Sequence, residues 1–278
     1  MAARSLDAAS LANPSSLPPR YQIRRLTPEH SLWVCALTMH SNTFHQSVFS
    51  KVYPIDQVGR FKQGIRAAAY LVDHQIKSGL SFGVFDLEYK FQHRSSEASG
   101  GAFLWDPNEE PMTGAQILSA MDFPLVSIAL SYDGIDPLNS AGVAPLVACL
   151  PVFGTIHRAL EELDPRKGSW HAKERGQVLM RNATATRVDY KGRGLMAGLA
   201  RFLMREAQLN GFKGVNIVAM NDAVTHVWTN PKQQGMKGEV TAEFWSPDYE
   251  EEDAGGKKVN PFFPAEQQIS RIWLCLDA

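Results

Sequence analysis

The 278-residue sequence predicts one mixed α/β domain, in which helices and strands alternate from residue 21 to the C-terminus. The strongest observation is the stretch Gln177–Trp228, which reads as a strand, a glycine-rich turn, a helix, a strand and a helix. A second observation is the helical spacing of apolar residues between Asp56 and Gly79. The third is the composition, since 44% hydrophobic residues suffice for a substantial core.

Composition also restricts the classes of function. A formal net charge of −1 argues against a nucleic-acid partner or an acidic membrane surface. The three cysteines (Cys35, Cys149 and Cys275) are far apart and show no CxxC spacing, which argues against a disulfide framework or a metal site. No apolar run reaches membrane-spanning length. We therefore expect a cytoplasmic protein without a metal ion or a membrane partner.

The first twenty residues are rich in Ala, Ser and Pro and have no apolar segment of the secretory type. Arg4, the serines and the single acidic residue Asp7 are compatible with a transit peptide. A disordered tail over residues 1–20 is the interpretation that this composition favours.

The first half of the chain is expected to hold three strands and two long helices, followed by an insertion. The strands are expected at Tyr21–Leu26, Leu80–Asp86 and Gly101–Trp105. The helices are expected from Thr27 to just before Tyr53, and from Asp56 to Gly79. Residues 115–166 combine helical runs, near Ala115–Met121 and Val152–Leu163, with several prolines and glycines. They are predicted to form a largely helical insertion.

The second half contains the clearest pattern. Its expected elements follow in chain order: a strand at Gln177–Val188, a helix at Leu195–Asn210, a strand at Val215–Ala219, a short helix at Asn221–Trp228, and closing strands at Val240–Trp245 and Ile269–Leu276. Residues 247–264, between the closing strands, are charged and rich in Gly and Pro, so we expect a mobile surface loop there.

The turn Lys191-Gly192-Arg193-Gly194-Leu195 lies at a predicted helix start, where backbone N–H groups can hold a phosphate. The simplest alternative is a tight connection whose glycines only supply positive φ angles. A dinucleotide site requires GxGxxG, and the third glycine is absent here. A Walker P-loop requires GxxxxGK[ST], which the chain lacks.

Two segments resemble the acyl-coenzyme A-binding core of the GNAT superfamily of N-acetyltransferases. Residues Val188–Met196 (VDYKGRGLM) resemble its Gln/Arg-x-x-Gly-x-Gly/Ala turn, and Asn221–Trp228 (NDAVTHVW) loosely resembles its Asn-x-x-Ala-x-x-Leu-Tyr signature. The two occur in the expected order, joined by a helix and a strand of the right length. The resemblance implies a GNAT-like α/β fold, with a mostly antiparallel central sheet flanked by helices and a helical insertion between strands 3 and 4.

The resemblance also implies a co-substrate, acetyl-coenzyme A or another acyl-coenzyme A. Its pyrophosphate would lie on the N–H groups of Lys191 through Met196, at the positive end of a helix dipole. By the same analogy, the backbone of Val188 would polarise the acyl carbonyl. The cofactor-binding residues implied are Val188, Lys191, Gly192, Arg193, Gly194, Leu195, Met196, Asn221 and Trp228.

The sequence departs from the family pattern in its acid–base groups. Trp228 stands where the family often has a tyrosine that protonates the leaving thiolate, and an indole N–H has no such chemistry near neutral pH. Asn182 lies near the position of a catalytic glutamate in some relatives, and an amide cannot act as a base. Lys191 replaces Gln or Arg, and Met196 replaces a small residue.

His45, near the end of the first helix, and Glu88, after the strand Leu80–Asp86, are therefore the expected candidates for the general base. The helical insertion is similar to one in arylalkylamine and dopamine N-acetyltransferases, which implies a small primary amine as acceptor. The predicted function is direct acyl transfer from coenzyme A to that amine. The alternative is a GNAT-fold protein that binds coenzyme A or another ligand without catalysis. The sequence says nothing about oligomeric state.

Overall fold

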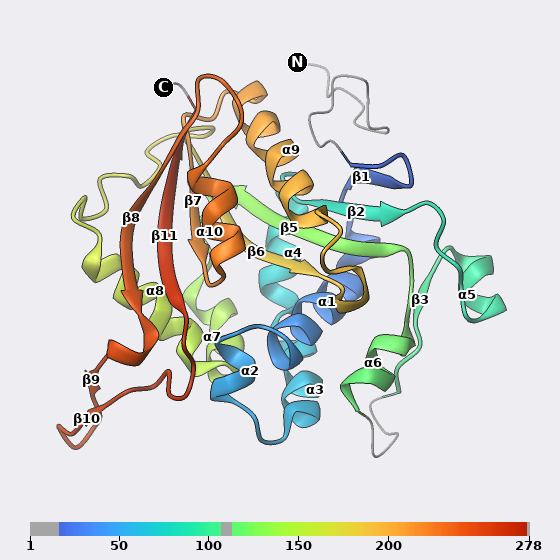
Figure 1. The fold of residues 1–278 in the computed structure, drawn as a ribbon, viewed down its shortest axis with the longest axis horizontal. Coiled ribbons are helices and arrows are strands. Elements are labelled where there is room, and N and C mark those ends of the chain that lie inside the picture. The colour runs from blue at the N-terminus through green and yellow to red at the C-terminus, as the bar shows by residue number, and fades with distance from the viewer. Residues whose placement is uncertain (1–16, 107–112, 277–278) are drawn as a thin grey trace.

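The computed structural model describes residues 17–106 and 113–276, and its centre is a seven-stranded sheet. The strand order is β1-β2-β5-β6-β7-β11-β8, and every neighbouring pair is antiparallel except β6 and β7 (Figure 1). The strands are β1 (Tyr21–Arg25), β2 (Phe82–Asp86), β5 (Leu125–Asp133), β6 (Val178–Thr186), β7 (Gly214–Ala219), β8 (Lys237–Trp245) and β11 (Gln268–Cys275). The predicted mixed, mostly antiparallel α/β fold is confirmed.

Helices cover both faces of the sheet and create two hydrophobic cores (Figure 1). The helices are α1 (Ser31–Phe44), α2 (Phe49–Val52), α3 (Gln57–Ala67), α4 (Ala69–Lys77), α5 (Arg94–Ser99), α6 (Gly114–Ala120), α7 (Ser140–Cys149), α8 (Pro151–Leu163), α9 (Leu195–Leu209) and α10 (Asp222–Thr229). One core lies under α1, α3, α4, α7 and α8, and the other under α9 and α10. The candidate site lies between these two cores, at the centre of the sheet.

The third strand of the sheet is not the one that the sequence predicts. It is β5, which falls inside the segment expected to be helical, and all nine of its residues are buried. A strand covered on both faces has no polar alternation, so its sequence does not show the period of two that identifies half-buried strands. The predicted strand Gly101–Trp105 contributes only β3 (Ala102–Phe103), which pairs with β4 (Met121–Asp122) in a separate small sheet. The helical insertion between the third and fourth sheet strands is therefore α7 and α8.

The first predicted helix is divided into η1 (Pro28–His30), α1 and α2. The division after α1 has a local cause, because the Gln46 side-chain oxygen accepts hydrogen bonds from the Val48 and Phe49 N–H groups, both at 2.7 Å. The second predicted helix is divided at Ala68 into α3 and α4.

Residues 247–264, expected as a mobile loop, carry the end of η3 (Ser246–Asp248) and a short hairpin formed by β9 (Glu251–Glu252) and β10 (Lys258–Val259). Phe262 anchors the segment, since it is fully buried and packs on Phe244 and Tyr249. The sequence missed this anchor because one aromatic residue in a charged segment gives no periodic signal. The expected N-terminal tail lies almost wholly outside the described residues.

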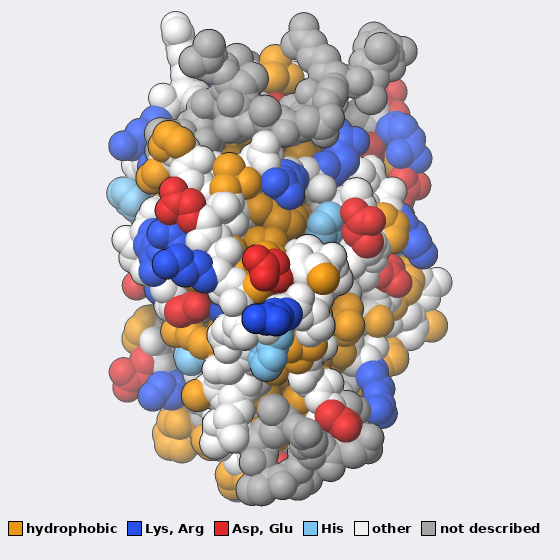
Figure 2. All heavy atoms as spheres, turned by 90° about the vertical axis from the view of Figure 1, so that its right-hand side faces the viewer, with side chains coloured by type: hydrophobic (Ala, Val, Ile, Leu, Met, Phe, Trp, Pro, Cys, Tyr) orange, Lys and Arg blue, Asp and Glu red, His pale blue; other side chains and the backbone are white. Residues whose placement is uncertain are grey.

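The surface that carries α5 and α6 intersperses basic and acidic side chains, without one large patch of either charge (Figure 2). None of the helices in the described ranges is both long and apolar enough to cross a membrane.

Candidate functional site

The parallel pair β6–β7 opens into a gap at the centre of the sheet. The two strands pair only between Val178–Arg181 and Gly214–Ile217, although β6 continues to Thr186 and β7 to Ala219. On its other side, β6 has a bulge against β5, because Ser131 pairs with Arg181 and Leu130 pairs with Ala183, which leaves Asn182 as the extra residue. A bulge bends its strand and increases the local twist, which favours the separation of β6 from β7.

A turn with an open backbone surface lies beyond the gap, at the start of α9. Gly192 and Gly194 adopt φ angles of 77° and 74°, which favour glycine strongly. A Cβ at either position would meet nothing within 4 Å, so space is open in front of both. No side chain caps α9, and its first N–H groups have no intrahelical partners. The turn is therefore an uncapped helix N-terminus that faces open space.

Positive charge surrounds this turn. A cavity of about 480 Å³, here called the cradle cavity, is lined by residues 190–197 together with the end of α1 and the start of α10. Lys191 and Arg193 are exposed in its lining, which contains no Asp or Glu. A hydrogen bond to the Tyr21 hydroxyl, at 3.2 Å, raises the pKa of Arg193 above its usual range. Cations and free N–H groups together make this cavity suited to an anion.

The end of α1 is tied to the end of β7. Gln46 Nε2 and Ser47 Oγ each donate to the Met220 carbonyl oxygen at 3.2 Å. Asn221 follows and caps α10, since its Oδ1 accepts from the Ala223 N–H at 3.0 Å. These contacts fix the outer end of the gap between β6 and β7.

Three cavities follow one another through the gap. A cavity of about 110 Å³, the split cavity, is lined by β6 and β7 and shares Gln46, Thr184, Asn221 and Val224 with the cradle cavity. A third cavity of about 460 Å³, the helix-side cavity, lies under α7 and α8 and shares Phe153, Arg181, Asn182 and Val218 with the split cavity. The shared linings join the cradle, at the start of α9, to the helices on the opposite face of the sheet.

Two titratable residues of α8, His157 and Glu161, line the helix-side cavity. Burial, followed by the charge of Arg271, lowers the pKa of His157 to about 4, so its imidazole is neutral at neutral pH. Glu161 Oε2 accepts from Arg271 NH1 at 2.7 Å. The residues are four apart on one helix, a spacing that puts both on one face. That spacing is the signal in the sequence that points to this pair, which the prediction of His45 and Glu88 does not include.

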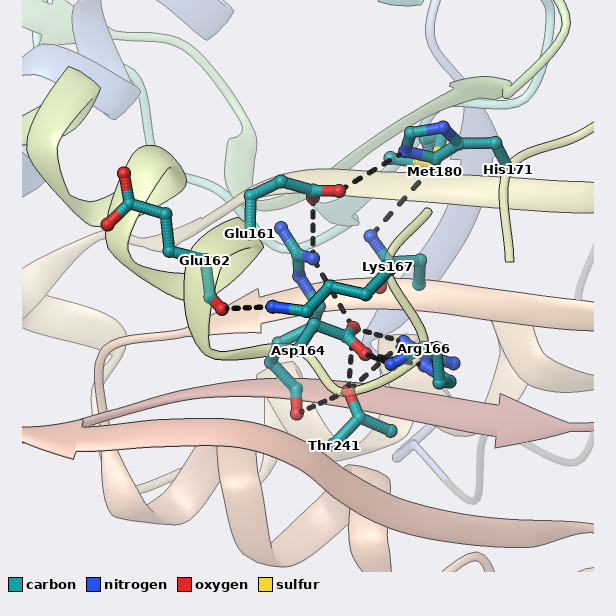
Figure 3. Close-up of polar contacts among 10 residues, drawn as sticks. Glu161, Glu162, Asp164, Arg166, Lys167, His171, Met180 and Thr241 are labelled. Atoms are coloured by element: carbon teal, nitrogen blue, oxygen red, sulfur yellow. Dashed lines mark hydrogen bonds and ion pairs between the residues drawn. The ribbon is translucent and has the colours of Figure 1, made fainter. Parts of the chain in front are cut away.

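An ion-pair network around Asp164 includes Glu161, which lines the helix-side cavity (Figure 3). Fully buried Asp164 accepts two hydrogen bonds from the Arg166 guanidinium, at 2.7 and 3.0 Å, and lies 3.4 Å from Arg271 NH1. Hydrogen bonds and the charges of these arginines lower the pKa of the Asp164 carboxyl to about 2, against the opposing effect of burial. The arginines also lie against the Trp170 ring, which lines the cavity.

Most of the predicted cofactor residues lie together. The cradle cavity is lined by seven of them: Lys191, Gly192, Arg193, Gly194, Leu195, Met196 and Asn221. His45 lines the same cavity, and burial together with the charge of Lys191 lowers the pKa of its imidazole. His45 therefore lies on the cradle side of the gap, outside the lining of the helix-side cavity.

The other predicted site residues lie elsewhere. Val188 is beyond the end of β6, in η2 (Val188–Tyr190), and lines none of the three cavities. The Asn182–Thr186 segment of β6 borders the gap in its place. Glu88 is exposed, 3.8 Å from Arg20, and also lines none of the three. Trp228 is 1% exposed and belongs to the core under α9 and α10.

Replacing Trp228 with phenylalanine is expected to lower the free energy of unfolding by about 1–3 kcal/mol, because the smaller ring leaves a cavity in a packed core. The affinity for acetyl-coenzyme A is expected to stay the same, since the indole lines no part of the cradle cavity. Urea denaturation and isothermal titration calorimetry measure the two quantities. Weaker binding with unchanged stability would contradict the core position of Trp228.

Comparison with known proteins identifies the fold. No protein-family model and no curated protein matches the chain. Among solved structures, the C-terminal condensation domain of Ebony in complex with beta-alanyl-dopamine is 15% identical, with a TM-score of 0.60 over 91% of this chain and 97% of that one. Arylalkylamine N-acetyltransferase 2 from Aedes aegypti is 10% identical, with a TM-score of 0.52 over 92% and 99%. A Drosophila melanogaster polyamine N-acetyltransferase is 13% identical, with a TM-score of 0.52 over 92% and 100%.

The chain therefore has the GNAT fold, as its two sequence motifs predict. At these identities the similarity establishes the architecture alone, since one fold can carry many different activities.

Proposed function

We propose that this protein is an acyl-coenzyme A-dependent N-acyltransferase, which moves an acetyl or other acyl group directly to a small primary amine. The observation that carries the proposal is the series of three cavities. An anion-binding cradle at the start of α9 leads through a gap between two parallel strands to a cavity on the other face of the sheet. Such a passage lets a long phosphorylated thioester and an amine approach each other from opposite sides.

The residues present fit coenzyme A. The N–H groups at the start of α9, with Lys191 and Arg193, would hold the pyrophosphate, and the open space before Gly194 would admit it. The unpaired edge of β6 at Asn182–Thr186 would offer backbone hydrogen bonds to the pantetheine arm. Acetyl-coenzyme A, or another acyl-coenzyme A, is thus the proposed co-substrate.

The reaction forms a C–N bond, breaks the thioester C–S bond, removes a proton from the amine and returns one to the thiolate. The roles expected of His45 and Glu88 stay predictions. On the acceptor side, we propose that His157 and Glu161 receive the amine proton, directly or through water. Burial lowers the pKa of the His157 imidazole, which is therefore neutral at neutral pH and can accept a proton.

The structural neighbours support a small amine as acceptor, since they include arylalkylamine, agmatine and polyamine N-acetyltransferases. We further propose one domain over residues 21–278 and a cytoplasmic location, without nucleic-acid or membrane partners. The three free cysteines support a reducing compartment.

One observation favours the second candidate function, a coenzyme A-binding protein without transferase activity. The lining of the split cavity, where the thioester would lie, contains no Asp, Glu, His, Tyr, Cys or Lys. The leaving thiolate would therefore take its proton from solvent, or transfer would not occur.

Two measurements separate these candidates. Acetyl-coenzyme A at about 100 times its Kd should stabilise the protein by about 2.7 kcal/mol, which corresponds to a rise in Tm of about 5–10 °C. Release of free thiol with a panel of primary amines then tests transfer. Stabilisation without thiol release would favour the binder, and the absence of stabilisation would refute the coenzyme A site.

A further inference from the structure

The helix-side cavity combines apolar walls with a charged floor. Its walls come from α7 and α8 and include Val143, Val147 and Phe153. Its floor is the sheet, which contributes two arginines, Arg181 from β6 and Arg271 from β11. Both arginines are at least 96% buried, but their surroundings differ.

Arg271 has acidic partners. Its NH1 group lies 2.7 Å from Glu161 Oε2 and 3.4 Å from Asp164 Oδ2, so its charge is balanced within the protein. This is the usual state of a buried charge, because an unpaired one loses hydration energy without compensation.

Arg181 has only neutral partners. Its NH1 group donates to the Leu130 carbonyl oxygen at 2.7 Å and to that of Ala183, and its NH2 group donates to Thr184 Oγ1. No Asp or Glu in the described ranges lies within ion-pair distance of it. A guanidinium has five N–H donors, so two have no partner in those ranges, the Nε–H among them.

Burial lowers the pKa of Arg181 to about 9, and the group is still protonated at neutral pH. Glu161 is the one carboxylate in the cavity lining, and Arg271 is its partner. The cavity therefore holds an uncompensated positive charge where the split cavity meets it.

We propose that the helix-side cavity binds an acceptor that carries a carboxylate, with Arg181 as its counter-ion. The acceptor class is then α-amino acids and related amino acids, whose apolar side chains would pack on α7 and α8. This inference rests on the proposed function and narrows its substrate. This acceptor class differs from the carboxylate-free amines after which the arylalkylamine, agmatine and polyamine N-acetyltransferases are named.

Matched acceptor pairs test the proposal in the full-length protein. Phenylalanine and phenylethylamine, tyrosine and tyramine, and arginine and agmatine differ in each case only by the carboxylate. With acetyl-coenzyme A, thiol release should give a kcat/KM at least about tenfold higher for each amino acid, mainly through KM. Phenylalaninamide, which keeps the shape and loses the anion, should behave like phenylethylamine.

The variant Arg181→Gln should raise KM for the amino acids by about tenfold to a hundredfold, a much larger factor than for the plain amines. Arg175→Gln is the matched control, because that arginine is 71% exposed, is paired with Asp136 and lines none of the three cavities. The amide comparison decides the question without any mutation, should Arg181→Gln fail to fold.

Three results would overturn the assignment: faster transfer to the plain amines, an equal loss of kcat for every acceptor in Arg181→Gln, or a preference for malonyl- over acetyl-coenzyme A without discrimination between acceptors. Calorimetric titration with phenylalanine and phenylalaninamide, without coenzyme A, separates this proposal from the proposed function. Selective binding of phenylalanine would support the carboxylate site even if no transfer occurs, and equal or absent binding of both would refute it.

Discussion

Valine at position 194 should weaken acetyl-coenzyme A binding by about a hundredfold and remove most of the acyl transfer. Gly194 has a φ of 74°, which a β-branched residue adopts only with strain. The added side chain would also stand in the open space before the first N–H groups of α9. Several charge-assisted hydrogen bonds to phosphate would be lost together. Isothermal titration calorimetry measures the affinity, and thiol release measures the transfer.

Gly211 provides the matched control at the other end of α9. Its φ is 82°, and a Cβ there would also meet nothing within 4 Å, but it lines none of the three cavities. Gly194→Val and Gly211→Val should therefore lose similar stability, about 1–3 kcal/mol, and only the first should lose the ligand. If both variants lost the same affinity for acetyl-coenzyme A, the loss would come from damage to the whole of α9. Unchanged affinity in Gly194→Val would contradict the cradle.

Asparagine in place of Asp164 is expected to lower the free energy of unfolding by about 3 kcal/mol. The Asp164 side chain is fully buried and accepts two hydrogen bonds from the Arg166 guanidinium in a bidentate pair. Loss of the carboxylate charge therefore leaves part of a buried positive charge without a partner. Asp136→Asn is the control, because that carboxylate is 53% exposed and its pair with Arg175 is open to solvent. The control should cost less than about 1 kcal/mol in urea denaturation.

The difference in unfolding free energy between the wild type and Asp164→Asn should also depend on pH. The folded state lowers the pKa of Asp164 from 3.8 to about 2, so its ionised form is favoured in the native protein. The resulting stability, about 2 kcal/mol, is present above pH 4 and is lost as the pH falls towards 2. The two unfolding free energies should approach each other over that interval. A constant difference from pH 5 to pH 2 would show that the carboxylate charge does not stabilise the fold.

Elements with a periodic apolar pattern, or with glycines that mark their ends, were predictable from the sequence. Helix α9 combines an apolar stripe with glycines at both ends, and β7 has Val215, Ile217 and Ala219 at a spacing of two, so both occur within a residue or two of their expected bounds. Strand β5 was missed because burial on both faces removes alternation, and it lies between residues that favour turns and helices. The break between α1 and α2 depends on one side chain, Gln46, whose hydrogen bonds no propensity describes.

The candidate site likewise has one part that the sequence predicts and one part that it does not. The cradle is a contiguous segment, Lys191–Met196, and its backbone conformation follows from two glycines, so the sequence was sufficient to find it. His157, Arg181 and Arg271 come from one helix and two strands far apart in the chain. Apart from the four-residue spacing of His157 and Glu161, nothing local distinguishes them from ordinary helix and strand residues.

The sequence by itself therefore determined α9, β7 and the conformation of the glycine turn before α9, because backbone dihedral angles and periodicity are local properties of the chain. Only the tertiary structure decided where β6 separates from β7, because that depends on the pairing of β6 with both neighbours and on the bulge at Asn182. It also decided which charges stay uncompensated. Arg271 meets two carboxylates of the α8 segment and Arg181 meets none, and long-range packing alone sets that difference.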